Sequence, residues 1–286
     1  MLKKNIDNVN IIIYLIYRHC LHTKMIQNLA EGRKNMLNGQ IQKLAITAAI
    51  LLVLQNIVFF TAFGILGGAI GWPGSLDLPA GESLPLIREN AGAVFQGYYI
   101  YLMSVIITLP MWVLTRQALL GRMDAISRVI FDLVVYLCIA AVSAKALGIL
   151  RWLFAMPYLA KLLESDPSSQ PMVTMMFDIL NLYAGKAGEH LGVQLFSALY
   201  TLCAGFALTR MSGTFRLLGI AGIIVGLLFL PYGDLLGLDN GIFLTVSGFA
   251  NTAWTIALAF ILIMKRKWLG SGSAEKSLSP SYSTSL

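Results

Sequence analysis

The stretch LAITAAILLVLQNIVFFTAFGILGGAI, residues 44–70, decides the fold class of this chain. It carries no charged residue, and it is longer than the roughly 20 residues that a helix needs to cross a bilayer. It is followed by Gly71-Trp72-Pro73-Gly74, a composition typical of a turn. Because backbone groups in hydrocarbon must pair within their own segment, we predict a membrane-spanning helix.

Five further apolar runs follow the first one. Their ranges are Phe95–Leu114, Val129–Leu150, Leu191–Leu208, Leu217–Leu230 and Ile242–Met264. The whole chain is 57% hydrophobic and 12% charged, whereas a soluble domain carries roughly 25% charged residues. We therefore predict an all-α, polytopic transmembrane helix bundle of six spans in residues 41–268. The run Leu217–Leu230 is the shortest and needs flanking residues to cross.

The positions of the 21 Lys and Arg residues predict the orientation of the spans. Most of them lie in the N-terminal leader, in the linkers after the second and fourth runs, and in the C-terminal tail. The linker after the fifth run holds Asp234 and Asp239 but no Lys or Arg. Because cytoplasmic loops retain basic residues, we expect both termini in the cytoplasm and the chain in the plasma (inner) membrane. The net charge of +7 has the same explanation, so no nucleic-acid partner is expected.

The two ends of the chain lie outside the predicted bundle. Residues 1–40 form a basic leader whose apolar stretch, residues 11–17, is too short to span and has no signal cleavage site after it. The leader is either a segment on the membrane surface, or untranslated because synthesis begins at Met25 or Met36 rather than Met1. Residues 269–286 are rich in Ser and Gly, and we expect them to be disordered.

The linker from Arg151 to Glu189 is the one long segment on the outer side. A polar stretch, residues 165–171, divides it into two apolar-rich parts, Trp152–Leu163 and Met172–Tyr183. Both parts show apolar residues at helical spacing but carry too many polar residues to span. We predict short interfacial helices that lie over the outer mouth of the bundle, between spans three and four.

Two charged residues, Asp132 and Lys145, lie inside the third run. Arg128 lies one helical turn before Asp132 and is its expected partner. Thirteen residues separate Asp132 from Lys145, about 20 Å and about 140° on a helix, so they cannot pair with each other. They are either an anchored carboxylate and a snorkelling amine, or parts of one polar pathway for protons or a solute. Gln194 and Asn251 are further candidates for that pathway, with interhelical hydrogen bonding as the alternative.

Glu189 and His190 form a second candidate site, at the outer start of the fourth run. A helix N-terminus favours the carboxylate, and a histidine titrates near neutral pH. No cofactor and no metal site are expected, because the chain has no nucleotide fingerprint and no paired cysteines. Gly64 and Gly68 have the small-xxx-small spacing of helix contacts, which favours a second copy or a partner membrane protein there.

The order of these features resembles that of domain of unknown function 4386, a family of six-span bacterial membrane proteins. The resemblance covers about residues 40–268. It rests on His190-Leu191-Gly192, Arg210-Met211-Ser212-Gly213 and Leu217-Leu218-Gly219-Ile220, with Arg128-x-x-x-Asp132 at the entry to the third run. The chain departs from the family where Thr214-Phe215-Arg216 replaces a Pro-Arg turn. The resemblance implies a bacterial membrane protein and no known activity.

These observations place the chain in the lipid bilayer without identifying a reaction or a solute. Among specific roles, a small-solute or proton-linked carrier is our first expectation, since six spans can divide into two halves of three. The alternatives are an intramembrane enzyme with its site at the outer end of span four, and a non-catalytic assembly or sensory subunit.

Overall fold

The computed structural model describes residues 2–231 and 240–278, and the side chains of residues 29, 31–231 and 245–271. Every described element is a helix, so the all-α prediction is confirmed. Five helices are long and apolar enough to cross a bilayer: Glu31–Ile70, Ala91–Leu119, Ala125–Ser165, Pro167–Thr209 and Thr245–Ser271. A sixth apolar helix, Thr214–Leu228, is shorter and matches the predicted fifth span.

Large apolar side chains lie on the outside of this bundle. Ile57, Val129 and Phe260 are each exposed over more than half of their surface, at 58%, 69% and 64%. Soluble monomers rarely expose apolar surface on this scale, because water penalises it. Hydrocarbon does not, and the long apolar helices satisfy their backbone groups internally. The chain is therefore a multi-pass membrane protein.

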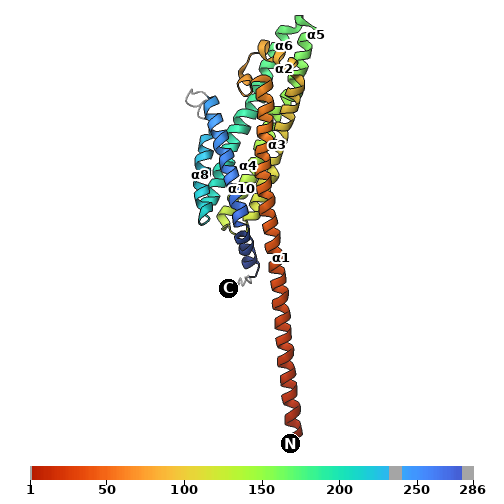
Figure 1. The fold of residues 1–286 in the computed structure, drawn as a ribbon, viewed down its shortest axis with the longest axis vertical. Coiled ribbons are helices and arrows are strands. Elements are labelled where there is room, and N and C mark those ends of the chain that lie inside the picture. Colours follow the sequence, from red (N-terminus) through yellow and green to blue (C-terminus); the bar gives the residue numbers. More distant parts are fainter. Residues whose placement is uncertain (1, 232–239, 279–286) are drawn as a thin grey trace, which may run out of the picture.

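Helix α1 (Leu2–Ile70) contains both the leader and the first span. It ends where the sequence predicts, because Gly71 has a φ of 68°, a left-handed conformation that stops a helix. The leader, predicted as a separate segment of residues 1–40, is instead continuous with the span and projects beyond the bundle (Figure 1). No proline interrupts α1, and single glycines such as Gly32 and Gly39 cost a helix only about 1 kcal/mol each.

The remaining spanning helices form a bundle around the upper part of α1 (Figure 1). A 3-10 turn, η1 (Gly74–Asp77), and a short helix, α2 (Ala80–Glu89), connect α1 to α3 (Ala91–Leu119). Next come α4 (Ala125–Leu150), α7 (Ser197–Thr209), α8 (Thr214–Leu228) and α10 (Asn240–Leu278). Helix α1 packs against α3 and α10, and α7 packs against α8 and α4.

The segment between spans three and four corrects a prediction. Two helices do occur there, α5 (Met156–Ser165) and α6 (Gln170–Leu180), separated by the short turn η3 (Pro167–Ser169). They do not lie flat as independent interfacial helices. Three π-helical segments, η2 (Arg151–Ala155), η4 (Asn181–Gly185) and η5 (Ala187–Phe196), join them to α4 and α7 without a break. The result is an outer helical hairpin against which α2 packs (Figure 1).

The length of this hairpin explains why it leaves the bilayer. The helix from Ala125 to Ser165 has 41 residues, so it is about 60 Å long at 1.5 Å per residue. A hydrocarbon core is only about 30 Å thick. Apolar side chains of the hairpin, including Leu159 and Phe177, are buried against α2 rather than in lipid.

The beginning of the C-terminal tail also differs from the prediction. Helix α10 continues past residue 268 to Leu278, whereas disorder was predicted from residue 269 onward. Leu269 is fully buried, and Arg122 donates hydrogen bonds to the Trp268 carbonyl and the Ser271 hydroxyl over 2.6 Å each. These contacts fix the end of α10 to the loop between α3 and α4. Residues 279–286 of the predicted tail lie outside the described residues.

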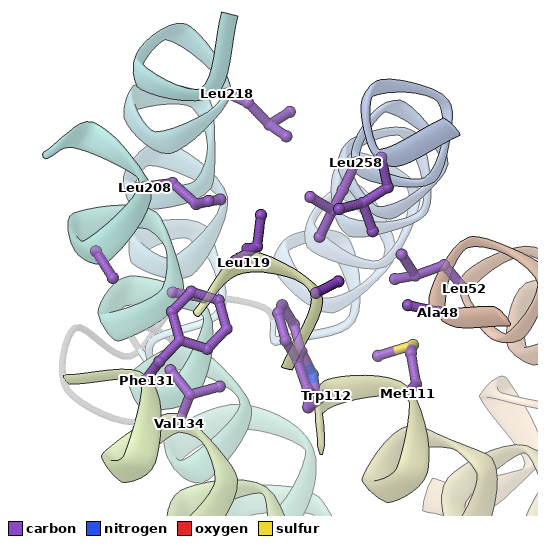
Figure 2. Close-up of a cluster of buried hydrophobic side chains, with 14 of the residues drawn as sticks. Ala48, Leu52, Met111, Trp112, Leu119, Phe131, Val134, Leu208, Leu218 and Leu258 are labelled. Atoms are coloured by element: carbon purple, nitrogen blue, oxygen red, sulfur yellow. The ribbon is translucent and has the colours of Figure 1, made fainter. Parts of the chain in front are cut away.

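Two clusters of buried apolar side chains hold the bundle together. The first includes Leu52, Trp112, Phe131 and Leu258, from four different helices, and Figure 2 shows these side chains converging. The second lies toward the outer hairpin and joins residues of α1, α2 and α3 to residues of α4, η2, α5 and α6. The space between the two clusters is the setting of the candidate site.

Candidate functional site: a polar cavity between two apolar cores

A cavity of about 240 Å³ lies inside the bundle. Its lining includes Met111 and Trp112 from the first apolar cluster, and Tyr98 and Trp152 from the second. The cavity therefore lies between the two cores. Residues from α1, α3, α4, η5, α7 and α10 contribute to its wall, together with the turn after α1 and the segments η1, η2 and η4, so it is a partly open cavity between the spanning helices.

One part of the wall is polar. Lys145 lines the cavity, and so do Asn56, Asn251 and Thr252 from the helices opposite. Within the described residues, no ion pair or hydrogen bond holds the Lys145 ammonium. Asn56 donates hydrogen bonds to the Leu52 carbonyl over 2.7 Å and to the Thr255 hydroxyl over 3.0 Å. The second of these bonds joins α1 to α10 beside the cavity.

Arg151 and Glu189 form an ion pair that belongs to the polar part of the wall. The Arg151 guanidinium donates to the Glu189 carboxylate over 2.9 Å and to the Asn181 carbonyl over 3.3 Å. Its carbon lies 5.3 Å from the centre of the Trp152 ring, within the range of a cation–π contact. Only 4% of the Arg151 side chain is exposed, against 33% for Glu189. Both residues line the cavity.

Glycines allow the helices that carry these charges to approach closely. A Cβ atom at Gly188 would lie 2.8 Å from the Gly148 Cα, and one at Gly192 would lie 2.8 Å from the Lys145 backbone nitrogen. A side chain at Gly185 would overlap the Arg151 guanidinium. Small residues at such a crossing are the usual basis of tight helix packing in membranes. They bring the outer ends of spans three and four into direct backbone contact.

The same region departs from regular α-helical geometry. Segments η2 and η5, which carry Arg151 and Glu189, are π-helical, with i to i+5 spacing. The Ser197 hydroxyl donates to the Gly192 carbonyl over 2.9 Å, five residues back, where η5 returns to α-helix. Short π-helical segments in α-helices occur frequently at functional sites, because they re-aim side chains.

The other part of the wall is aromatic. We call this group the aromatic wall; it consists of Phe59, Phe60, Phe63, Trp72, Tyr101 and Phe249. Its rings contact one another edge to face or tilted, for example Phe63 with Trp72 at 5.5 Å and Phe59 with Tyr101 at 5.8 Å between centroids. Phe60 of α1 stacks on Phe249 of α10 at 6.1 Å. The lining of the cavity thus combines polar and aromatic side chains.

The residues that the sequence singled out are distributed unevenly around this cavity. Lys145, Asn251 and Glu189 line it. Gln194 is buried in η5, but neither it nor His190 belongs to the lining. Asp132 is also away from the cavity, and its carboxylate pairs with Arg116 of α3 at 2.5 Å. The expectation that Arg128 is its partner is therefore wrong.

The glycines predicted to meet a partner lie on the outside of α1. Gly64 and Gly68 are exposed, and a Cβ atom at either would have nothing within 4 Å. This face is unoccupied within the described part of the chain. Among the described residues there is also no group of three or more His, Cys, Asp or Glu side chains that could hold a metal ion.

Sequence reasoning missed Arg151, Tyr98, Trp112 and the aromatic wall as parts of one site. One signal was available for the charged residues. Arg151 directly follows the third apolar run and Glu189 lies two residues before the start of the fourth, so the two opposite charges lie at a similar depth on neighbouring spans. No comparable signal marks the aromatic residues, because apolar rings are equally common on faces that meet lipid.

The fold and the cavity define a multi-pass α-helical membrane protein with an internal, partly polar cavity. Comparisons with protein-family models, with curated proteins and with solved structures found no match. The resemblance to the six-span bacterial family stays a prediction, and the function rests on the site itself.

Proposed function

We propose that the chain binds a small solute in the cavity and carries it across the bacterial plasma membrane. The observation that carries this proposal is the cavity, which lies between the spanning helices and is lined by Lys145 without a partner among the described residues. Carriers place their substrate sites within the bilayer, between helices that rearrange around the bound solute. In this proposal both termini lie in the cytoplasm, in agreement with the distribution of Lys and Arg.

The position of Lys145 supports a functional role for this residue. Lys145 lies five residues before the end of the third apolar run, so its insertion costs less than the about 2.5–3.5 kcal/mol of a lysine at a helix centre, and within the bundle it lines the cavity. Asp132 has a different environment, because its ion pair with Arg116 satisfies its charge outside the cavity. We therefore assign the solute pathway to Lys145 and Asn251, and we assign Asp132 to helix packing.

Cysteine accessibility tests this proposal without knowledge of the solute. Cys20, Cys138 and Cys203 are replaced by Ala, and Asn251→Cys is introduced on the cavity side of α10. A membrane-impermeant, anionic methanethiosulfonate reagent is then applied to right-side-out and inside-out vesicles. Because thiolates react and thiols in hydrocarbon stay protonated, a water-filled cavity gives rapid labelling. A carrier that alternates between its two faces gives labelling from both sides.

Ile256→Cys is the matched control on the same helix. Ile256 is 46% exposed on the outside of the bundle and does not line the cavity, so it stays unlabelled from either side. No labelling of Asn251→Cys from either side would contradict the proposal. Labelling from the outer side alone would contradict transport and favour a receptor or an enzyme open to that side.

A second role, assembly with a partner in the bilayer, is supported by the exposed glycines of α1. The face with Gly64 and Gly68 has nothing packed on it and allows a close approach of another helix. Disulfide crosslinking of a Gly68→Cys variant, in the same cysteine-free background, tests contact with a second copy. A dimer band that a Phe260→Cys control on α10 does not give would support this role. A purely monomeric product would contradict contact between two copies at this face.

The enzymatic alternative has weaker support. Glu189 lines the cavity, but its carboxylate is held by Arg151, and His190 is not part of the lining. The two residues therefore do not present a free acid and base to the same space.

A further inference from the structure

We infer that the cavity selects an organic monoanion with a flat, apolar body, such as an aromatic carboxylate. This inference rests on the proposed function, because it names the class of solute that the same cavity accepts. It depends on three independent features of the lining: its net charge, the kind of polar atom that it leaves without a partner, and its aromatic wall.

The described part of the lining has a net positive charge. Of the described residues that line the cavity, only Lys145, Arg151 and Glu189 carry charge. Arg151 and Glu189 neutralise each other through their 2.9 Å contact. Lys145 has no counter-ion among the described residues, so one positive charge remains for the ligand to balance. A solute with one negative charge restores neutrality and removes the cost of the uncompensated cation.

The fully enclosed side-chain atoms of lining residues that lack a partner are donors. Three buried side-chain atoms of lining residues have no hydrogen-bond partner within the described residues, namely the Tyr98 hydroxyl, the Trp112 Nε1 and the Arg151 Nε. An indole N–H and a guanidinium N–H can only donate, and a phenol hydroxyl donates readily. Within the described residues, no enclosed amide or carboxylate oxygen of a lining residue is left in the same state. An excess of unpartnered donors around the cavity favours a ligand rich in acceptor oxygens over a cation.

The aromatic wall specifies the rest of the ligand. It consists mainly of Phe59 and Phe63 of α1, Trp72 of the turn that follows α1, and Tyr101 of α3. Rings prefer to pack on other rings in offset or edge-to-face arrangements, which adds to the gain from burial. A cavity of about 150 Å³ accommodates benzene. The 240 Å³ of this cavity therefore suits one or two fused rings with a carboxylate.

Calorimetric titration of the full chain in zwitterionic nanodiscs tests the inference, with empty nanodiscs as the blank. The probes are 2-naphthoate, the neutral 2-naphthylmethanol, the cationic 2-naphthylmethylammonium, and decanoate as a single-chain carboxylate of the kind that a bilayer supplies. We expect 2-naphthoate to bind at least about tenfold more tightly than the neutral and cationic probes, because charge-assisted hydrogen bonds are the strong ones. We also expect it to bind more tightly than decanoate, which cannot pack a ring on the aromatic wall.

Variants separate the role of Lys145 from general effects of charge. Lys145→Met loses the preference for 2-naphthoate over 2-naphthylmethanol, and Lys145→Arg keeps it. Lys161→Met is the matched control, since Lys161 is an exposed residue of α5 outside the cavity. This variant binds the probes as the parent chain does.

Equal binding of the acid and the alcohol by the parent chain would overturn the monoanion inference while leaving a small-solute site in place. Tighter binding of decanoate than of 2-naphthoate would overturn the aromatic body. Binding of none of the four probes would also overturn the inference, whereas the proposed function is judged separately, by the labelling of Asn251→Cys.

Discussion

Arg151, at the outer end of span three, donates a 2.9 Å hydrogen bond to Glu189, at the outer start of span four. The two residues are 38 positions apart in the chain, and the outer helical hairpin lies between them. The guanidinium is enclosed by Gly185 and the Trp152 ring, so Glu189 is its only carboxylate partner in the described part of the chain. This pair fixes the register of two spans beside the cavity.

Removing the acidic partner of this pair should destabilise the protein. In Glu189→Gln the Arg151 charge stays buried without compensation, and breaking a buried pair costs about 3–5 kcal/mol. Glu189 is a third exposed, so we expect a lower value, about 2–3 kcal/mol, visible as a lower midpoint of thermal unfolding in detergent.

Glu164→Gln is the control for this change. Glu164 lies 3.7 Å from Arg88 on the same outer hairpin, and both side chains are more than 40% exposed. Exposed pairs contribute about 0–1 kcal/mol, so this variant should unfold close to the parent chain. A Glu189→Gln variant as stable as Glu164→Gln would show that the buried pair does not hold the spans together.

Adding a methyl group at the crossing of spans three and four should also destabilise the protein. In Gly188→Ala the new Cβ atom would lie 2.8 Å from the Gly148 Cα, so the two backbones must separate. Overpacking of this kind costs about 1–3 kcal/mol. Gly68→Ala, where nothing lies within 4 Å, should instead gain up to about 1 kcal/mol from helix propensity. Unfolding midpoints of the two variants should therefore move in opposite directions, and a shift of both in the same direction would contradict the close crossing.

The sequence predicts the positions of the spans well, for a simple physical reason. A run such as residues 44–70 is uncharged and longer than the bilayer is thick, so a helix is its only stable conformation there. The end of α1 at Ile70 follows from Gly71 in the same way. Both the span and its end depend only on residues that are adjacent in the sequence, so the sequence predicts them.

The candidate site could be predicted only in part, because membrane helices are apolar on all sides. A face that meets lipid and a face that meets another helix look alike in the sequence, so the rings of the aromatic wall carry no distinguishing signal. The sequence also does not show which side chains on neighbouring helices pair with each other. The local i to i+4 rule favours Arg128 for Asp132, yet the structure pairs Asp132 with Arg116 of α3. Asn56 and Thr255, which bond across 199 positions, show no relationship in the sequence.

A carboxylate at the N-terminal end of α4 should make stability depend on pH in acid. Arg210 bonds the Asp124 carboxylate over 3.0 Å, and the Ser127 N–H donates to it over 2.7 Å as a helix cap. Arg210 first, and Ser127 second, hold the pKa of Asp124 well below its usual range. Folding thus lowers this pKa, so the stabilisation is fully present above the unfolded value of about 4 and is lost as pH falls toward the folded value.

The variant Asp124→Asn tests this pH dependence. The difference in unfolding midpoint between the parent chain and the variant should be constant from pH 5 to pH 8 and should shrink below about pH 4. Arg210→Met keeps the cap but removes the main cause of the lowered pKa, so its difference from the parent should also shrink in acid. A difference that grows as the pH falls would contradict the assigned partners.

The number of crossings gives a further prediction, and α8 decides it. This helix has 15 residues and is about 22 Å long, less than the roughly 30 Å of a hydrocarbon core. It nevertheless packs along α7 and α10 within the bundle rather than across its end (Figure 1). A short helix in that position can cross by local thinning of the bilayer and by flanking residues at the interface.

Six crossings place both termini on the same face, whereas five would place them on opposite faces. We therefore expect epitope tags fused to residues 1 and 286 to be protected together from protease added to intact spheroplasts, and to be cut together in inside-out vesicles. An exposed outer loop, with a cleavage site inserted between Asp166 and Ser169 at the tip of the hairpin, is the control and should be cut only from the outside. Cleavage of one terminal tag alone in intact spheroplasts would show that α8 does not cross.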